Sequence, residues 1–196
     1  MLLSDDDVIM CEGGLHAMLR AWSLSRDQLV GIGARHHRAL PPANPLQLAI
    51  AKAGGGGGGS TQLYQYQEAG AQGAHYRGYS LMTGRFNLVH RKYLRMFAEE
   101  LPQSFRDYIN THKPTCEDMT LSFMISNRTG KPPLHIRAVE ACRRTIEHGD
   151  MHASVTGWNM KRTLCLNRLA GEFGRMPLVH SRCNIALNAS QLYEGS

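Results

Sequence analysis

Six consecutive glycines, Gly54 to Gly59, divide the chain and limit what it can fold into. Glycine loses more backbone freedom on ordering than any other residue, so such a run holds no fixed conformation by itself. The run could join two domains, but neither flank has the elements of a complete one. We therefore expect one domain over residues 1–196 with a disordered Gly-rich insertion from about Pro41 to His75.

The composition of the chain is that of a globular protein, because 42% of its 196 residues are hydrophobic and 19% are charged. The formal net charge of +6 favours an anionic partner, such as a phosphate or an acidic glycan. The basic residues form no stripe with interleaved aromatic residues, so no nucleic-acid binding is predicted. No apolar run reaches the roughly 18 residues that a membrane span needs.

Hydrophobic periodicity predicts helices that mix with short strands. Helices are expected over residues 12–26, 91–101, 102–110, 116–128 and 161–173, and strands over residues 28–33 and 79–84. Thr115 is the expected N-cap of the fourth helix, and Gly130 and Gly174 are expected to end the last two helices. This mixture, without a sequence repeat, indicates an α/β or α+β domain.

Three carboxylates, Asp5, Asp6 and Asp7, follow a short apolar stretch that reads as the end of a buried strand. A strand usually has about five residues, so we expect that the domain is N-terminally truncated. Alternate strand residues share a face, so Asp5 and Asp7 would point together and could hold Mg²⁺ or Mn²⁺ beside a diphosphate. The triplet is equally compatible with a solvated acidic end or a helix-capping cluster.

Other polar residues allow two readings each. Cys116, Glu117 and Asp118 stand at an expected helix start, where the helix dipole favours carboxylates and simple capping would explain them. Arg162 could fork onto phosphate oxygens or lie on a solvated helix face. The adjacent pair His36-His37 lacks partners at metal-ligand spacing, so a surface or loop position is predicted for it.

Taken in order, these features resemble the exostosin and exostosin-like glycosyltransferases of glycosyltransferase family 64. The resemblance runs from Leu3 to about Asn188 and skips the glycine-rich segment. Its landmarks are the acidic triplet, Trp22, Asp27-Gln-Leu-Val-Gly-Ile, Arg35, Tyr79-Ser-Leu, Lys92-Tyr-Leu, Cys116-Glu-Asp-Met-Thr-Leu-Ser-Phe, Lys131-Pro-Pro, Trp158, Arg162-Thr-Leu-Cys-Leu-Asn-Arg-Leu and Met176-Pro-Leu. A single acidic motif is weak, whereas an ordered series of landmarks is specific.

The resemblance implies a partial GT-A fold of the α/β class, with the Rossmann-like nucleotide half truncated and the acceptor half present. It implies a retaining, Mn²⁺- or Mg²⁺-dependent enzyme that moves a sugar, typically an N-acetylhexosamine, from a UDP-sugar to a glycan or glycolipid acceptor. It also implies the lumen of the Golgi or endoplasmic reticulum, with membrane association only through a segment absent from this chain. The alternative is an inactive fragment or interaction module that retains the acceptor half.

The family's metal motif falls on the acidic triplet. By this resemblance Asp7 would be the direct metal ligand, and Asp5 and Asp6 would contact the donor or metal-bound water, with Asp5 also part of the metal site. The bound ion would offset charge on the departing UDP.

The family's remaining site residues fall on the two later helices. By resemblance Asp118 would be the catalytic carboxylate, Glu117 would bind the donor, and Arg162 would neutralise the diphosphate. Cys116 and Cys165 match a pair that is disulfide-bonded in the family. That bond would hold the helices of Asp118 and Arg162 in register.

Overall fold

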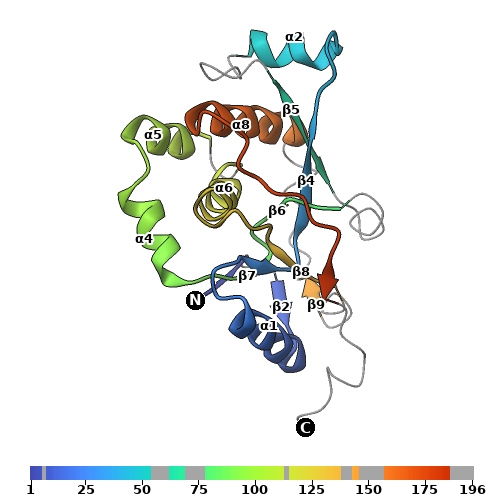
Figure 1. Ribbon diagram of the computed structural model, residues 1–196, viewed down its shortest axis with the longest axis vertical. Coiled ribbons are helices and arrows are strands. Elements are labelled where there is room, and N and C mark those ends of the chain that lie inside the picture. The colour runs from blue at the N-terminus through green and yellow to red at the C-terminus, as the bar shows by residue number, and fades with distance from the viewer. Residues whose placement is uncertain are drawn as a thin grey trace.

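The computed structural model describes residues 1–5, 8–53, 62–68, 78–112, 115–137, 143–145 and 157–185 of the chain. Within these residues, helices and strands mix around a sheet that contains parallel strand pairs, which agrees with the α/β class (Figure 1). Asp6, Asp7 and the six-glycine run lie outside them.

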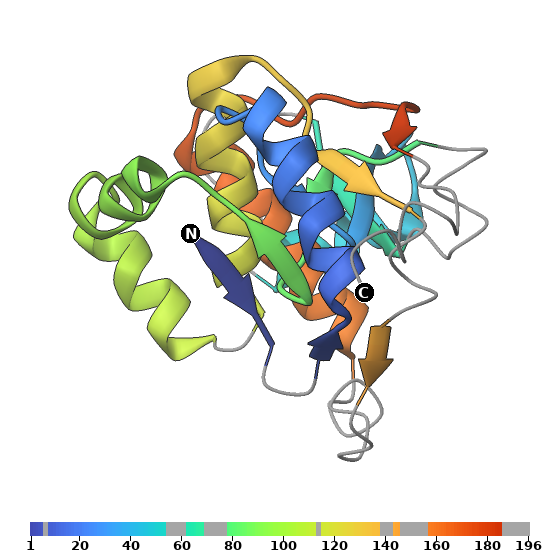
Figure 2. The same ribbon diagram turned by 90° about the horizontal axis from the view of Figure 1, so that it is seen from below.

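The main sheet has five strands in the order β1 (Leu2–Ser4), β7 (Phe86–Leu88), β3 (Val30–Gly31), β8 (Leu134–Ile136) and β10 (Asn184–Ile185). β7 pairs antiparallel with both β1 and β3, whereas β8 pairs parallel with both β3 and β10. Figure 2 shows β1, at the chain start, beside β7. This pairing brings the start of the acidic triplet to the turn that precedes β7.

Helices cover both faces of the main sheet (Figure 1). α1 (Glu12–Leu24) packs Met18 and Ala21 against one face. α4 (Arg91–Glu99) and α6 (Glu117–Thr129) pack against the other. Successive strand residues point to opposite faces, so neighbours such as Leu88 and Val89 enter different clusters. Burial from both sides agrees with the mainly apolar residues of the central strands β7, β3 and β8.

The second sheet has three antiparallel strands, in the order β5 (Tyr64–Glu68), β4 (Ala34–Ala39) and β6 (Leu81–Met82). β4 and β5 form a hairpin that carries α2 (Pro45–Lys52) on the described part of its connection. α2 begins at Asn44, whose side chain accepts a hydrogen bond from the backbone amide of Leu46 at 2.9 Å. The expectation of disorder from Pro41 to His75 is therefore wrong for α2 and β5.

α8 (Trp158–Glu172) runs along the outer edge of β5. The Asn167 side chain accepts from the Tyr64 amide at 2.8 Å and donates to the Tyr64 carbonyl at 2.7 Å, and the Thr163 hydroxyl accepts from the Tyr66 amide at 3.2 Å. Helix side chains thus satisfy backbone groups that an edge strand would leave unpaired. α5 (Gln103–Thr111) completes the core beneath α6 and α8 with Phe105 and Ile109.

The predicted helices are confirmed to within a few residues, and their ends have local causes. Gly130 adopts a φ of 65° directly after α6, a conformation that favours glycine, so it ends this helix as predicted. The N-cap of α6 is Cys116 rather than Thr115, because the Thr115 hydroxyl donates to the carbonyl of His112 instead. A short antiparallel pair joins β2 (Val8–Met10) to β9 (Arg143–Thr145). None of the helices in the described ranges is long and apolar enough to cross a bilayer.

Candidate functional site

A tight turn between β6 and β7 lies at the centre of the site. The side-chain amide of Asn87 donates hydrogen bonds to the backbone carbonyls of Thr83 and Gly84, at 2.9 and 3.2 Å, and so stabilises the turn. A side chain at position 84 would place its Cβ 2.6 Å from Oδ1 of Asp5, closer than atoms pack. Gly84 therefore lets the Asp5 carboxylate lie directly against the backbone.

Asp118 lies on the opposite side of the same turn, in the first turn of α6. Its Oδ2 accepts a hydrogen bond from the Gly84 amide at 3.1 Å, and its Oδ1 accepts from the Met119 amide at 2.6 Å. Gly84 thus lies between two carboxylates, Asp5 and Asp118, that are far apart in the sequence. These two backbone amides fix the position of the Asp118 carboxylate.

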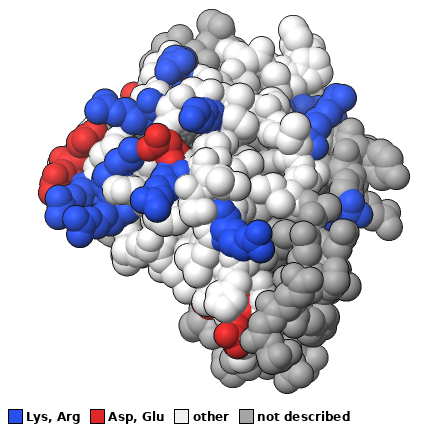
Figure 3. All heavy atoms as spheres, turned by 60° about the horizontal axis from the view of Figure 1, so that its bottom comes forward, with Lys and Arg blue, Asp and Glu red and all other residues white. Residues whose placement is uncertain are grey.

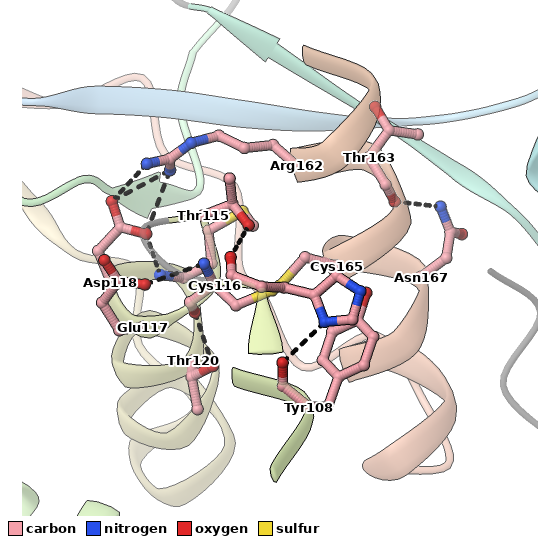
Figure 4. The surroundings of a disulfide bond; sticks show 12 residues. Tyr108, Thr115, Cys116, Glu117, Asp118, Thr120, Arg162, Thr163, Cys165 and Asn167 are labelled. Carbon is pink, nitrogen blue, oxygen red and sulfur yellow. Dashed lines mark hydrogen bonds and ion pairs between the residues drawn. A yellow bond between two sulfur atoms is a disulfide. The ribbon is translucent and has the colours of Figure 1, made fainter. Parts of the chain in front are cut away.

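Arg162 reaches Asp118 from α8 and forms a bidentate ion pair (Figure 4). Its Nη1 donates to Oδ1 and Oδ2 at 3.1 and 3.0 Å, and its Nη2 donates to Oδ2 at 3.0 Å. The two side chains are 6% and 12% exposed, so the reading of Arg162 as part of a solvated helix face is wrong. Burial has the largest single effect and lowers the pKa of Arg162, but the charge and hydrogen bonds of Asp118 together with Tyr66 and Glu117 raise it further, so the net pKa of Arg162 is raised and the guanidinium stays charged.

Aromatic rings enclose the Arg162 guanidinium. Its Cζ lies 4.8 Å from the ring centroid of Trp158 and 5.4 Å from that of Tyr66. The Tyr66 hydroxyl accepts a hydrogen bond from Nε of Arg35 at 3.1 Å. Nε of Arg162 is buried and has no hydrogen-bond partner in the described ranges. The guanidinium is therefore held in place by the two aromatic rings and by Asp118, and its Nε–H group makes no hydrogen bond to a described residue.

A disulfide between Cys116 and Cys165 joins the helices that carry the ion pair, as predicted from the family resemblance. The two Cα atoms are 5.8 Å apart, and the bond closes a sequence separation of 49 residues. Figure 4 shows it beneath the Asp118–Arg162 pair, between the start of α6 and the middle of α8. Cross-linking at this point holds the two charged side chains at one relative position.

Of the remaining candidate site residues, the structure describes Glu117 and Asp5, whereas Asp6 and Asp7 lie outside the described residues. The Glu117 carboxylate accepts from the Cys116 amide at 3.1 Å, so here it caps the helix start, which is the simpler of its two readings. Asp5 directly follows β1, with its backbone amide donating to the Arg85 carbonyl at 3.0 Å. No group of three potential ligands is close enough to hold a metal among the described residues, which exclude Asp6 and Asp7. The metal site stays a prediction.

Two site residues escaped the sequence analysis. Gly84 ends an expected strand in the sequence. Only the structure shows that glycine is required there, because Asp5 occupies the space that a side chain would need. Tyr66 falls in the segment expected to be disordered, yet it is 3% exposed beside Arg162. An alternating Tyr-Gln-Tyr-Gln pattern over residues 64–67 was the available signal, because period two is typical of a half-buried strand.

The two adjacent histidines are also misplaced by the sequence analysis. His36 and His37 lie on β4 and are 8% and 6% exposed, so the predicted surface or loop position is wrong. Nδ1 of His37 is 2.8 Å from the Ser80 hydroxyl, and its ring centroid is 4.4 Å from that of His180. Burial first, and then the neighbouring histidines, lower the pKa of His37 to about 3, so its ring is neutral near pH 7.

Charges on the face drawn in Figure 3 are of both signs. Lys and Arg gather on one side of this face together with Asp and Glu, and much of the remaining described surface is uncharged. Lys92 and Asp27 form a half-exposed ion pair, and the Lys92 contact lowers the pKa of Asp27. This face therefore presents no unbroken basic surface. That the chain does not bind nucleic acid stays a prediction.

Comparison with known proteins identifies relatives along nearly the whole chain. A model of the glycosyl transferase family 64 domain matches residues 1–192. Glycosylinositol phosphorylceramide mannosyl transferase 1 of Arabidopsis thaliana is 28% identical over 179 residues, which are 90% of this chain and 47% of that protein. The exostosin-like-3 homolog of Caenorhabditis elegans is 25% identical over 187 residues, covering 93% of this chain and 19% of that protein. Exostosin-1 of Pongo abelii is 28% identical over 112 residues, 55% of this chain and 15% of that protein. The chain thus spans less than half the length of these relatives.

Proposed function

Because the chain belongs to glycosyltransferase family 64, we propose that it carries the catalytic and acceptor-side residues of a metal-dependent sugar transfer. The donor is a UDP-sugar and the acceptor a glycan or glycolipid, and the transfer retains configuration. The scaffold is the acceptor side of a GT-A fold. The place of action is the lumen of the Golgi or endoplasmic reticulum.

The Asp118–Arg162 pair beside the Gly84 turn is the observation that carries the proposal. Sugar transfer passes through a state with positive charge at the anomeric carbon and negative charge on the departing diphosphate. The Asp118 carboxylate is held by the Gly84 amide and by Arg162, and it offsets the positive charge. Its position is fixed before substrate binds, so little reorganisation accompanies the reaction.

The metal belongs on the other side of the same turn. Asp5 offers hard carboxylate oxygens there, which fit Mn²⁺ or Mg²⁺. The absence of a side chain at Gly84 leaves the space that this carboxylate occupies. Asp7 and Asp5 would hold the ion, and Asp6 and Glu117 would contact the donor. When bound, the ion supplies positive charge to the diphosphate.

Arg162 has two tasks under this proposal. Its described contact is with Asp118, which it positions. The buried Nε, without a partner among the described residues, is a donor left for a donor-phosphate oxygen, in agreement with the role that the family resemblance implies. Loss of Arg162 should therefore weaken both donor binding and transfer.

The test uses the full chain with MnCl₂ and a panel of donors, namely UDP-N-acetylglucosamine, UDP-N-acetylgalactosamine and GDP-mannose. The mannose donor is included because the Arabidopsis relative is named a mannosyl transferase. UDP binding is measured by calorimetry, and sugar transfer or donor hydrolysis by release of the nucleotide. We expect Mn²⁺-dependent binding, and release that the conservative variant Asp118→Asn lowers about 100-fold or more. A wild-type chain that binds no nucleotide, or an unchanged rate in Asp118→Asn, would contradict the proposal.

A further inference from the structure

The chain contains two triplets of the form Asn-x-Ser/Thr, namely Asn127-Arg128-Thr129 and Asn188-Ala189-Ser190. Such a triplet is the acceptor sequence for N-linked glycosylation when its middle residue is not proline. Triplets of this kind also arise by chance, so the place of the asparagine in the fold decides whether it can carry a glycan. The structure describes all three residues of the first triplet, whereas Asn188 lies outside the described residues.

Asn127 lies where α6 reaches the surface of the molecule. Every residue from Met119 to Ser126 is buried, whereas Asn127 and Arg128 are exposed. Gly130, with a φ of 65°, ends the helix directly afterwards. In Figure 2 this end of the yellow helix lies at the upper edge of the ribbon. A glycan attached to Asn127 would therefore extend into solvent without displacing a core side chain.

The side chain of Asn127 makes its described hydrogen bond through the oxygen of its amide. Its Oδ1 accepts from Nη2 of Arg175 at 2.7 Å, and both side chains are exposed. N-linked glycosylation modifies the other end of the amide, at Nδ2. The amide oxygen remains an acceptor after that change, so the contact with Arg175 can persist beside an attached sugar. The folded position thus fits the modified side chain as well as the unmodified one.

The disulfide between Cys116 and Cys165 agrees with a chain that folds where such glycans are added. Disulfides form and persist in the lumen of the endoplasmic reticulum and in secreted proteins, and they are rare in the cytosol. Acceptor triplets for N-linked glycans are likewise used in proteins of the secretory route. Both modifications therefore belong to one environment.

We propose that Asn127 carries an N-linked glycan. The proposal goes beyond the glycosyltransferase function and rests on the lumenal place of action proposed above. The co-reactant is an oligosaccharide held on a lipid pyrophosphate. Nδ2 of Asn127 forms a bond to the anomeric carbon of the oligosaccharide and loses a proton, while the bond from that carbon to the pyrophosphate breaks and the lipid pyrophosphate leaves.

The glycan and the candidate site lie at opposite ends of α6. Asp118 is in the first turn of this helix and Asn127 in the last. At a rise of 1.5 Å per residue, the two positions are about 14 Å apart along the helix axis. The glycan therefore leaves the Asp118–Arg162 pair accessible to substrate.

The experiment produces the full chain behind a heterologous signal peptide in cultured insect cells. Its mobility on a denaturing gel is compared before and after treatment with peptide-N-glycosidase F. We expect faster migration after treatment. When the treatment is carried out in water labelled with heavy oxygen, peptide mass spectrometry should find a labelled aspartate at position 127, because the enzyme converts a glycosylated asparagine into aspartate.

Three variants test the triplet in an Asn188→Gln background, which removes any glycan at the second triplet. Asn127→Gln and Thr129→Ala should each abolish the mobility shift, whereas Thr129→Ser keeps an acceptor triplet and should retain it. Asn110→Gln is the matched control, because Asn110 is also an exposed helical asparagine but belongs to no such triplet, and it should leave the shift unchanged. The gel reads denatured whole-cell protein, so a variant that folds poorly still reports its glycan.

The inference is overturned if the peptide that contains Asn127 is found only unmodified, or if Thr129→Ala retains the mobility shift. Neither result depends on catalysis by this chain. Failure of the proposed function appears separately, as a wild-type chain that shows no Mn²⁺-dependent binding of UDP.

Discussion

Two neighbouring regions of this protein are stabilised by different kinds of contact. The α6–α8 junction, defined by Cys116, Asp118, Arg162 and Cys165, is held by a covalent bond and a buried ion pair. The hairpin arm, defined as β4, α2 and β5, is held by hydrogen bonds, one of them from the Arg35 guanidinium to the Tyr66 hydroxyl, and by burial of polar rings. The junction carries the charged pair on which the proposed transfer depends, whereas the hairpin arm supplies polar side chains that pack beside it. The difference shows that the two neighbouring regions depend on different interactions, one on a covalent bond and a buried ion pair and the other on hydrogen bonds to distant parts of the chain.

The strongest test of the junction removes its covalent bond. The double variant Cys116→Ala/Cys165→Ala should lower the free energy of unfolding by about 4 kcal/mol, as chain entropy predicts for a loop of this length. Urea denaturation followed by circular dichroism measures the change. Cys183→Ala is the matched control, because Cys183 is an exposed free thiol, and it should change stability by less than about 0.5 kcal/mol. Equal effects of the two variants would show that the junction does not depend on its disulfide.

The buried ion pair should give the next largest effect. Arg162→Leu leaves Asp118 charged and buried without its partner, so we expect a loss of about 3 kcal/mol in unfolding free energy. Arg168→Leu is the control on the same helix, since its ion pair with Glu172 is loose at 3.8 Å and partly exposed, and its loss should stay within about 1 kcal/mol. The double variant Asp118→Leu/Arg162→Leu should recover much of the stability, and the absence of any recovery would argue against a destabilising lone charge.

The junction was largely predictable from the sequence, and its chemistry explains why. Helical periodicity and terminating glycines fix α6 and α8 locally, and the pairing of cysteines came with the family resemblance. The direct contact between Asp118 and Arg162, which are 44 residues apart, was not predicted, because it depends on how the two helices that carry them pack together. Burial of Arg162 rules out its position on a solvated helix face, and burial is set by tertiary packing that the local sequence does not reveal.

The arm was missed for a physical reason. β4 reads Ala-Arg-His-His-Arg-Ala, which has no apolar alternation. Its buried polar side chains are satisfied by residues distant in the sequence, such as Ser80 and Tyr66. β5 follows the six-glycine run closely in the sequence. The low strand propensity of glycine led to the prediction of disorder across the whole segment, which includes this five-residue strand. Where stability comes from long-range polar contacts, single-sequence hydrophobicity carries little signal.

The link between the arm and the junction is tested by Asn167→Ala. This variant removes two hydrogen bonds to the Tyr64 backbone and leaves its amide and carbonyl without these partners, so we expect a loss of about 2 kcal/mol. Asn110→Ala on the exposed side of α5 is the control and should have little effect. Hydrogen exchange should locate the loss at the Tyr64 amide. Unchanged protection of that amide would show that α8 does not hold the edge of β5.

Acid should destabilise the arm by a smaller amount through His37. In the folded protein the pKa of His37 is lowered from 6.5 to about 3, so between these values the unfolded chain binds a proton that the folded chain does not. Unfolding then takes up a proton, and the free energy of unfolding falls as the pH falls. The stabilisation is fully present above about pH 6.5 and is lost progressively toward pH 3. Between pH 7.5 and 5.5 the loss from this group should be about 1 kcal/mol.

The variant His37→Gln should remove this part of the pH dependence, because glutamine keeps a hydrogen-bonding side chain beside Ser80 and does not titrate. Urea denaturation at pH 7.5 and 5.5 gives the difference for each protein, so any constant cost of the substitution cancels. His16→Gln, at an exposed position on α1, should leave the difference as in wild type. If His37→Gln retains the full acid sensitivity, the buried ring of the hairpin arm is not its source, and the contrast between the junction and the hairpin arm does not account for how the protein responds to pH.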